Sequence, residues 1–304
     1  MNVKASTQYK REHKADYGKE KIEILYEDKD IVIINKPTGM LSVPYPGSKA
    51  RTALSVLEKI YRSKGTYSPN HRPYIVHRLD RDTSGVMMFA LNESVQKKVM
   101  AEWHTMVTER LYHAVAENPR DKSKQLAESG TIDEPLAQNA HHVGYVPHDE
   151  DDHAKTVKAI THYKIIERGK THTLFELNLE TGKKNQIRAH LASKGYPLAG
   201  DENYRAKTDP FHRLALHART LAFKHPVTGT LMRFESPESK EWLEYVIKGD
   251  EHPATAIWND KSSPYNKKHP HEEGVSNSTL GAKRIPKKKA CKMDFISRGK
   301  MYSK

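Results

Sequence analysis

Cysteine is almost missing from this sequence: Cys291 is the only one among 304 residues. A single cysteine excludes an intrachain disulfide and is typical of proteins from a reducing compartment. The sequence also lacks any apolar run of the roughly 18 to 20 residues that a membrane-spanning helix needs. Its first 21 residues lack the apolar segment of a secretory signal peptide. We therefore expect a cytoplasmic protein that is not inserted in a membrane.

Hydrophobic residues are scarce as well, at 36% of the chain, and the mean hydropathy is −0.81. The shortage is greatest at the two ends, because residues 1–20 show no hydrophobic periodicity and apolar runs stop after Ile247. Polar ends that dilute a core of ordinary composition account for the low average. We therefore predict a flexible arm at 1–20, one folded domain at 21–247 and a basic, disordered tail at 248–304.

Acidic residues are outnumbered by basic ones, 38 against 51, which leaves a net charge of +13. An excess of this size favours a polyanionic partner, most often a nucleic acid. The alternative is that the charge only keeps the protein soluble. Residues 281–304 hold nine Lys and Arg against one Asp, so the tail either binds nucleic acid or is an inert, solubilising end.

Helical and alternating spacings of apolar residues are both present in the folded part of the chain. Helical spacing predicts helices at 53–64, the first of them capped by Thr52, and at 93–106, 183–197 and 238–248. Alternation between turn residues predicts a strand at 108–118, a charged loop at 119–158, and hairpins at 21–37, 159–182 and 219–237. This mixture, with most strands in hairpins, indicates an α+β fold with a mixed, mainly antiparallel sheet and flanking helices.

Charged residues gather at one place in this pattern. Residues 77–85, HRLDRDTSG, stand between two apolar segments that we interpret as buried strands. If the charged segment is itself extended, Arg78, Asp80 and Asp82 share one face. Charges beside buried strands are costly unless they are paired or have a task. The row is either a structural ion-pair network or a functional site, and the residues alone leave both open.

The same segment resembles the HRLDxxTSG signature of the RluA-type RNA pseudouridine synthases. Members of that family convert a uridine within RNA to pseudouridine: the base is cut from its ribose at nitrogen, turned, and rejoined through carbon. The resemblance implies their fold, with a central RNA-binding cleft, and a reaction that needs no metal and no cofactor. Four further stretches resemble family motifs in the family's order: INKPTGMLSVP (34–44), ERLYHAVAEN (109–118), LETGKKNQIRAHLASKGYPLAGDENY (179–204) and RLALHARTLAFKHPVTG (213–229).

The resemblance implies three catalytic residues. Asp80 is the catalytic carboxylate, which acts on a flipped-out nucleotide either as a nucleophile or as a base toward the ribose. Arg188 is its ion partner, because desolvation alone would neutralise a carboxylate in a pocket that excludes water. Tyr112 stacks on the uracil, and its hydroxyl takes the C5 proton late in the reaction. Without the resemblance, Arg188 would be interpreted as a solvated helix residue and Tyr112 as a half-buried strand residue.

Residues near these three are expected to bind the RNA. The resemblance implies that Arg78 fills the gap left by the flipped base; a phosphate contact or a pair with Asp82 is the alternative. The sequence departs from the family pattern where Arg110 replaces a lysine and where Asn185 replaces a histidine, and we expect the second change to alter an RNA contact. The full set of predicted RNA-binding residues is Arg78, Arg81, Lys183, Lys184, Asn185 and Gln186.

Two other functions compete with catalysis of this kind. A non-catalytic RNA-binding protein of the same fold could help RNA to fold, but the presence of Asp80, Tyr112 and Arg188 argues against it. A nuclease would need a metal–carboxylate site, for which the sequence offers no convincing set of ligands. We therefore expect a monomeric enzyme whose partner is structured RNA, either ribosomal or transfer RNA.

A cluster of histidines in the predicted loop raises the question of a metal. Acidic residues 149–152 stand among them, but known zinc spacings are tighter and lie on ordered turns, and no cysteine is near. We interpret the segment as a variable polar loop and expect no metal site. The four residues are His141, His142, His148 and His153.

Removal of residues 249–304 is expected to weaken RNA binding without changing the chemical step. The basic side chains of the tail can contact phosphates, but a segment without apolar periodicity does not shape a pocket. We predict weaker binding to transcribed ribosomal RNA at low salt, a shallower dependence of log affinity on log salt, and an unchanged single-turnover rate at saturating RNA. Titrations at several salt concentrations check this, and an unchanged salt slope would show that the tail is inert.

Overall fold

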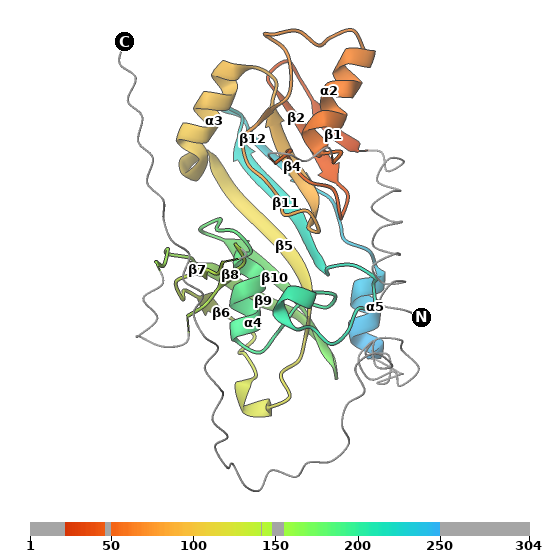
Figure 1. Ribbon diagram of the computed structural model, residues 1–304, viewed down its shortest axis with the longest axis vertical. Helices are drawn as coiled ribbons and strands as arrows, with labels where there is room; N and C mark the ends of the chain where they lie inside the picture. The colour runs from red at the N-terminus through yellow and green to blue at the C-terminus, as the bar shows by residue number, and fades with distance from the viewer. Residues whose placement is uncertain (1–21, 46–49, 141, 148–154, 250–304) are drawn as a thin grey trace, which may run out of the picture. The chain divides into compact units, whose positions relative to one another are not determined.

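The computed structural model of this protein describes residues 22–45, 50–140, 142–147 and 155–249. Their main feature is a sheet of ten strands, eight of which follow the order β1-β2-β4-β11-β5-β10-β9-β6, while β12 pairs with β11 and β3 with β4 (Figure 1). Within these residues, β4 and β11 pair in parallel and the other pairs of this sheet are antiparallel. The predicted α+β fold with a mixed, mainly antiparallel sheet is confirmed.

The strands and helices follow one another closely along the chain. The first half contains β1 (Glu23–Glu27), β2 (Ile31–Lys36), α2 (Ala53–Ser63), β3 (Tyr74–Ile75), β4 (Ser84–Ala90), α3 (Glu93–Met106) and β5 (Val107–Glu117). The second half contains η1 (Lys122–Lys124), β6 (Ser129–Ile132), β7 (Ala137–Gln138), β8 (Gly144–Tyr145), β9 (Thr161–Arg168), β10 (His172–Leu179), α4 (Gln186–Ser193), η2 (Glu202–Tyr204), β11 (Leu216–Lys224), β12 (Leu231–Glu235) and α5 (Glu241–Lys248). Strands β7 and β8 form a separate two-stranded sheet.

Local sequence signals set where the first two helices begin. The Thr52 hydroxyl accepts a hydrogen bond from the backbone N–H of Ser55, and the Ser55 hydroxyl accepts one from the backbone N–H of Thr52, which makes a capping box at the start of α2. Asn92 caps α3 through the backbone N–H of Val95. The predicted Thr52 cap and the predicted helix at 93–106 are confirmed.

Three sequence-based expectations need correction. The segment 77–83 is a loop with a turn at 81–82, so the expected row of charges on one strand face does not form. A run of charged side chains has no apolar face to place against a covered sheet, and it leaves the sheet instead. The predicted loop at 119–158 contains the strands β6, β7 and β8, and the helix predicted at 183–197 begins only at Gln186.

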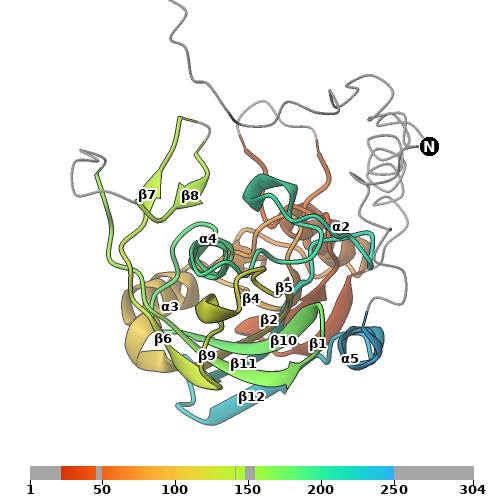
Figure 2. The ribbon, with the colours of Figure 1, turned by 90° about the horizontal axis from the view of Figure 1, so that it is seen from below.

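Alternate residues of the central strands pack against different helices. On β2, Ile34 packs in a cluster with α2, whereas its neighbour Ile33 packs in a cluster with α3. On β5, Ala114 packs with α4 and Val115 with α5. Tyr112 touches both the α2 cluster and the α4 cluster. Helices α2 and α4 therefore share one face of the sheet, as Figure 2 shows. None of the described helices is long and apolar enough to span a membrane.

The loop 77–83 leaves the sheet where β4 meets β11. Gly85 has a φ of +115°, and a Cβ atom there would lie 2.1 Å from the carbonyl oxygen of Ala218. Glycine is therefore required for this close parallel pairing. The glycine of HRLDRDTSG thus sets where the charged loop ends.

The loop 77–83 is held by hydrogen bonds from the end of β2 and from the segment that follows it. The Ser42 hydroxyl donates to the Leu79 carbonyl at 2.7 Å and accepts from the Leu79 N–H at 3.1 Å. The Lys36 ammonium is fully buried and donates to the Arg81 carbonyl at 3.1 Å. These bonds fix the backbone on both sides of Asp80, so a residue on a loop occupies a defined place.

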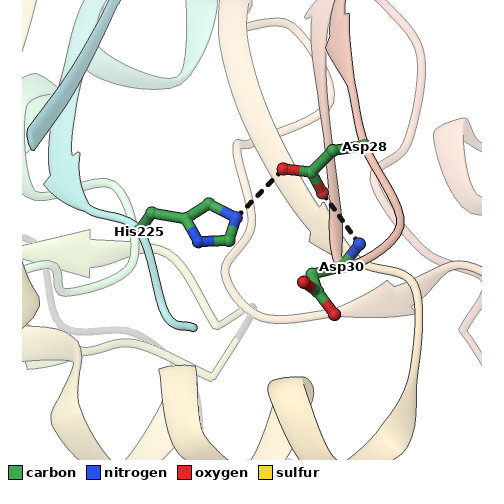
Figure 3. Close-up of side chains that lie close together, drawn as sticks. All are labelled: Asp28, Asp30 and His225. Atoms are coloured by element: carbon green, nitrogen blue, oxygen red, sulfur yellow. Dashed lines mark hydrogen bonds and ion pairs between the residues drawn. The ribbon is translucent and has the colours of Figure 1, made fainter. Parts of the chain in front are cut away.

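Asp28 ties the turn after β1 to the turn after β11 (Figure 3). Its Oδ1 accepts the backbone N–H groups of Asp30 and Ile31, each at 2.8 Å. Its Oδ2 accepts the Tyr26 hydroxyl at 2.9 Å and His225 Nε2 at 3.0 Å. Burial raises the pKa of Asp28, but these donors outweigh burial and hold the pKa below its ordinary value.

The imidazole of His225 is engaged on both sides. Its Nδ1 accepts the backbone N–H groups of Val227 and Thr228 at 3.2 and 3.1 Å, so Nε2 carries the proton that is donated to Asp28. Ligand atoms of Asp28, Asp30 and His225 lie within 4.8 Å of one another, as they would around a metal ion. Because both ring nitrogens and both Asp28 oxygens already have protein partners, we interpret the cluster as a hydrogen-bonded clamp between two turns.

Replacement His225→Ala is expected to destabilise the fold. The substitution removes the acceptor of the Val227 and Thr228 N–H groups and one of the four donors to the Asp28 carboxylate, and we predict a loss of about 1 to 3 kcal/mol in the free energy of unfolding at pH 7. The pKa of Asp28 is lowered in the folded protein, so its contribution is present above the ordinary Asp pKa and is lost as the pH falls through the lowered value. The difference between variant and wild type should therefore shrink in acid.

Urea unfolding at pH 7 and at about pH 3 measures both effects. The exposed neighbour Val227 provides a control, because Val227→Ala should change stability by less than about 0.5 kcal/mol. A loss for His225→Ala that is the same at both pH values would contradict the assigned contact with Asp28.

Candidate active site

A pocket of about 330 Å³ opens between segments that are far apart in the sequence. The loop 77–83, strand β5, the turn before α4 and α4 itself contribute its walls. Both polar and apolar residues line it, among them His77, Arg78, Asp80, Trp103, Arg110, Tyr112, Lys183, Asn185 and Arg188. The structure therefore brings the three predicted catalytic residues into one cavity.

Asp80 presents its carboxylate to the pocket from the loop, with 27% of the side chain exposed. Its Oδ2 accepts a hydrogen bond of 2.7 Å from Asn185 Nδ2. The nearest guanidinium nitrogen of Arg188 lies 3.9 Å from the same oxygen. Asp80 and Arg188 lie close together, as predicted. The direct hydrogen bond to Asp80, however, comes from Asn185, which the sequence analysis predicted to bind RNA.

Arg188 takes its main partner from elsewhere. Its Nε and one terminal nitrogen bind the two carboxylate oxygens of Asp201 at 2.6 and 2.8 Å, and both side chains are almost fully buried. The guanidinium also lies 5.1 Å from the ring centre of Tyr204. Burial lowers the pKa of Arg188, but Asp201 and then Asp80 raise it above its ordinary value. Arg188 is therefore a permanent cation whose orientation is set from behind by Asp201.

Tyr112 lies on β5 where the two core clusters of this face meet. Burial raises the pKa of its hydroxyl to about 12, Arg110 opposes this, and the charge of Asp80 adds to it. The phenol is therefore protonated at neutral pH. Tyr112 lines the same pocket as Asp80.

His77 opens the charged segment but does not take part as an acid or base. Its Nε2 accepts the backbone N–H of Met88 at 2.9 Å, and its ring lies against Trp103 with 4.8 Å between ring centres. Burial, with a smaller effect from Arg110, lowers the pKa of His77 to about 3. The imidazole is therefore neutral and forms a wall of the pocket.

The predicted RNA-binding residues divide into exposed and buried ones. Arg78, Lys183 and Lys184 are exposed. Arg81 is exposed too, but its guanidinium makes two hydrogen bonds to Asp82, at 3.0 and 2.9 Å. Asp82 is therefore paired with its chain neighbour, and not with Arg78 as one interpretation of the sequence had it.

The other two predicted RNA contacts, Asn185 and Gln186, are buried. The amide of Gln186 accepts the Lys183 N–H and the Thr181 hydroxyl at 2.9 and 2.8 Å, and donates to the Ile160 carbonyl at 2.9 Å. These bonds shape the turn that leads into α4. The buried amides therefore have protein partners in this structure.

Sequence reasoning missed two groups that shape the site. Asp201 and Tyr204 belong to GDENY, the end of the stretch 179–204 that resembles a family motif. That resemblance was the available signal for them. Nothing in its spacing showed that either would lie against Arg188. Of the histidines weighed as zinc ligands, His142 is exposed, and His141, His148 and His153 lie outside the described residues.

Comparisons with known proteins agree on one family. Residues 30–193 match the family model described as RNA pseudouridylate synthase. The uncharacterized RNA pseudouridine synthase YlyB of Bacillus subtilis is 35% identical over 231 residues, which cover 74% of this chain and 72% of the relative. The ribosomal large subunit pseudouridine synthase D of Pseudomonas aeruginosa is 35% identical over 245 residues, with 75% and 72% covered.

A solved structure gives the same answer for the fold. The human RNA pseudouridylate synthase domain containing 4 superimposes with a TM-score of 0.58 and 22% identity, over 78% of this chain and 95% of that chain. The similarity supports the fold described above.

Replacement Asp201→Asn is expected to destabilise the protein more than Asp82→Asn. The first change leaves the buried guanidinium of Arg188 without the partner that binds it at two points, which costs about 3 kcal/mol. The second breaks a pair whose side chains are 44% and 40% exposed, which is worth roughly 1 kcal/mol or less. Urea unfolding of both variants checks the difference, and equal losses would contradict the role given to Asp201.

Proposed function

Since this chain belongs to the RluA-type family of RNA pseudouridine synthases, we propose that it converts a uridine of ribosomal RNA to pseudouridine, with Asp80 as the catalytic carboxylate. The family follows from the model match and from relatives that are 35% identical over three quarters of the chain. Ribosomal RNA is preferred to transfer RNA because one of these relatives is named a ribosomal large subunit pseudouridine synthase. The proposed catalytic domain, 21–247, includes every residue of the pocket.

The observation that carries the proposal is the meeting of Asp80, Arg188 and Tyr112 in one pocket. A carboxylate that acts on a ribose must be ionised where water is excluded. An opposite charge and a donated hydrogen bond both favour the ionised form. Asp80 has the first from Arg188 at 3.9 Å and the second from Asn185 at 2.7 Å. It acts on the flipped-out nucleotide either as a nucleophile at the ribose or as a base toward it.

We propose that Tyr112 holds the uracil. Its ring stacks on the base. Because the pKa of its hydroxyl is about 12, the hydroxyl keeps its proton at neutral pH and can donate a hydrogen bond to the bound nucleotide. If it also takes the C5 proton of the uracil, it has to pass on its own proton in the same step. The phenolate is too rare at neutral pH to serve as a free base.

The entry of RNA depends on exposed cations around the pocket. Arg78 is exposed and lines the pocket, and its planar guanidinium can replace the flipped base in the stack. Lys183 and Lys184 are exposed on the turn before α4 and would contact phosphates. The overall charge of +13 would draw the polyanion toward this surface.

Replacement Asp80→Asn is expected to abolish isomerisation and to leave RNA binding nearly unchanged. Asparagine keeps the shape of the side chain and removes the charge that the reaction needs. The test is pseudouridine mapping of transcribed large-subunit ribosomal RNA after incubation with wild type or variant, together with a binding titration. Turnover by the variant within about tenfold of wild type, or ~1.4 kcal/mol of barrier, would contradict the assignment.

The same experiment separates the proposal from its alternatives. A protein that only binds and folds RNA would yield no pseudouridine with wild type either. If ribosomal RNA is unmodified and total transfer RNA is modified in an Asp80-dependent way, the chemistry stands and the proposed substrate is wrong. Mapping of total RNA from cells with and without the gene would then locate the target.

A further inference from the structure

The amide of Asn185 occupies a place where the family pattern has histidine. Asn185 is almost buried, at 9% exposure, and it immediately precedes α4. Its backbone has φ of 57° and ψ of 21°, in the left-handed region that asparagine tolerates better than most residues. Its side chain is buried, whereas its neighbours Lys183 and Lys184 are exposed.

Both ends of that amide have partners. Its Nδ2 donates to Asp80 Oδ2 at 2.7 Å, and its Oδ1 accepts the backbone N–H of Gly144 at 3.4 Å. An amide that must present its oxygen to an N–H and its nitrogen to a carboxylate has one orientation that satisfies both. The Gly144 contact therefore directs the Nδ2–H group at the carboxylate.

Gly144 is itself held on β8. Its carbonyl accepts the Tyr204 hydroxyl, and a Cβ atom at this position would lie 2.6 Å from the Lys184 carbonyl oxygen. Because only glycine fits so close to that carbonyl, its N–H can reach Asn185. The ring of Tyr204 lies 5.1 Å from the guanidinium of Arg188, which in turn lies 3.9 Å from Asp80. The contacts therefore form a closed chain that begins and ends at Asp80 Oδ2.

We infer that Asn185 is a positioning residue for the Asp80 carboxylate, oriented by the Gly144 peptide of β8, and not a contact to RNA. The inference rests on the proposed function, because it assigns a task to Asn185 only if Asp80 is catalytic. A loop carboxylate has several rotamers, and a short hydrogen bond to one oxygen selects among them. The amide does not titrate, so this donor is present at every pH, whereas an imidazole at the same place would change its charge near neutral pH.

The groups that face Asp80 make a pH test specific. Arg188 on α4 has a raised pKa, as do Tyr112 on β5 and Tyr204 near α4. In the same loop, burial raises the pKa of Asp82, but Arg81 lowers it to a net value below the ordinary one. All four keep one charge state between about pH 5.5 and 8. A new pH response in a variant at 185 then comes from the substituted side chain.

Two substitutions test the inference. Asn185→Gly removes the amide and keeps the left-handed backbone, because glycine adopts that conformation freely. We expect the single-turnover rate at saturating RNA to fall about 10- to 100-fold, while the affinity for transcribed large-subunit ribosomal RNA changes less than about threefold. Asn185→Asp keeps the shape and replaces the donor by a second carboxylate. We expect a greater loss at pH 8 that is partly relieved toward pH 5.5, because two adjacent carboxylates then share a proton that restores a donor.

Rates are expressed relative to wild type at each pH, which removes contributions that the variant and wild type share. Lys170→Ala is the comparison variant: Lys170 is exposed in the turn between β9 and β10 and does not line the pocket, so its replacement should leave the saturating rate nearly unchanged. Thermal unfolding shows whether each variant is folded. If Asn185→Gly weakens RNA binding and keeps the full saturating rate, or if Asn185→Asp shows no relief in acid, the inference is overturned.

Failure of the inference and failure of the proposed function give different results. If Asp80→Asn is inactive and Asn185→Gly reacts at the wild-type rate, Asp80 is catalytic but does not depend on Asn185. If Asp80→Asn remains active, the proposed function fails, and the positioning role is overturned with it. Gly144→Ala gives an independent arm, because it should lower the saturating rate without removing any side-chain donor.

Discussion

A buried guanidinium is destabilising unless an opposite charge is paired with it, and Arg188 is paired with two carboxylates. Asp201 binds two of its nitrogens at 2.6 and 2.8 Å, and Asp80 faces a third at 3.9 Å. The contact with Asp201 orients the guanidinium, and the contact with Asp80 places its positive charge beside the pocket carboxylate. Because Asp201 lies just before η2 and Asp80 lies on the loop between β3 and β4, this one cation of α4 links two segments that are far apart in the sequence.

The remaining construction keeps a loop carboxylate in place. Loops carry functional groups well only when a rigid scaffold holds them. Here the scaffold acts through the backbone: Ser42 binds Leu79, and Thr38 donates to the Asp82 carbonyl at 2.8 Å. The side chain of Asp80 takes no part in these backbone contacts, and its hydrogen bond and ion pair are with Asn185 and Arg188 in the pocket. In this short segment the backbone atoms make the structural contacts, and the side chain of the proposed catalytic residue, Asp80, faces the pocket.

Much of the fold was predictable because its signals are local. The helix at 93–106 follows from apolar spacing, the start of α2 from the Thr52 cap, and the hairpin turn near Gly169 from turn residues between two alternating runs. One of the three corrected expectations concerned 77–83, where a shared face of charges required an extended segment although the segment lacks an apolar face. Neighbouring charges, Arg81 and Asp82, paired with each other once the backbone turned.

The sequence by itself determined which residues are candidates for the chemistry: Asp80, Tyr112 and Arg188 could be proposed from motifs alone. Only the tertiary structure decided how Asp80 is held. Its hydrogen bond comes from Asn185, 105 positions away, and that amide is oriented by a glycine in a segment expected to be a loop. Spacing and composition report which face of an element is apolar. They do not report which polar atoms of distant elements come within 3 Å, because that depends on how the whole sheet and its helices pack.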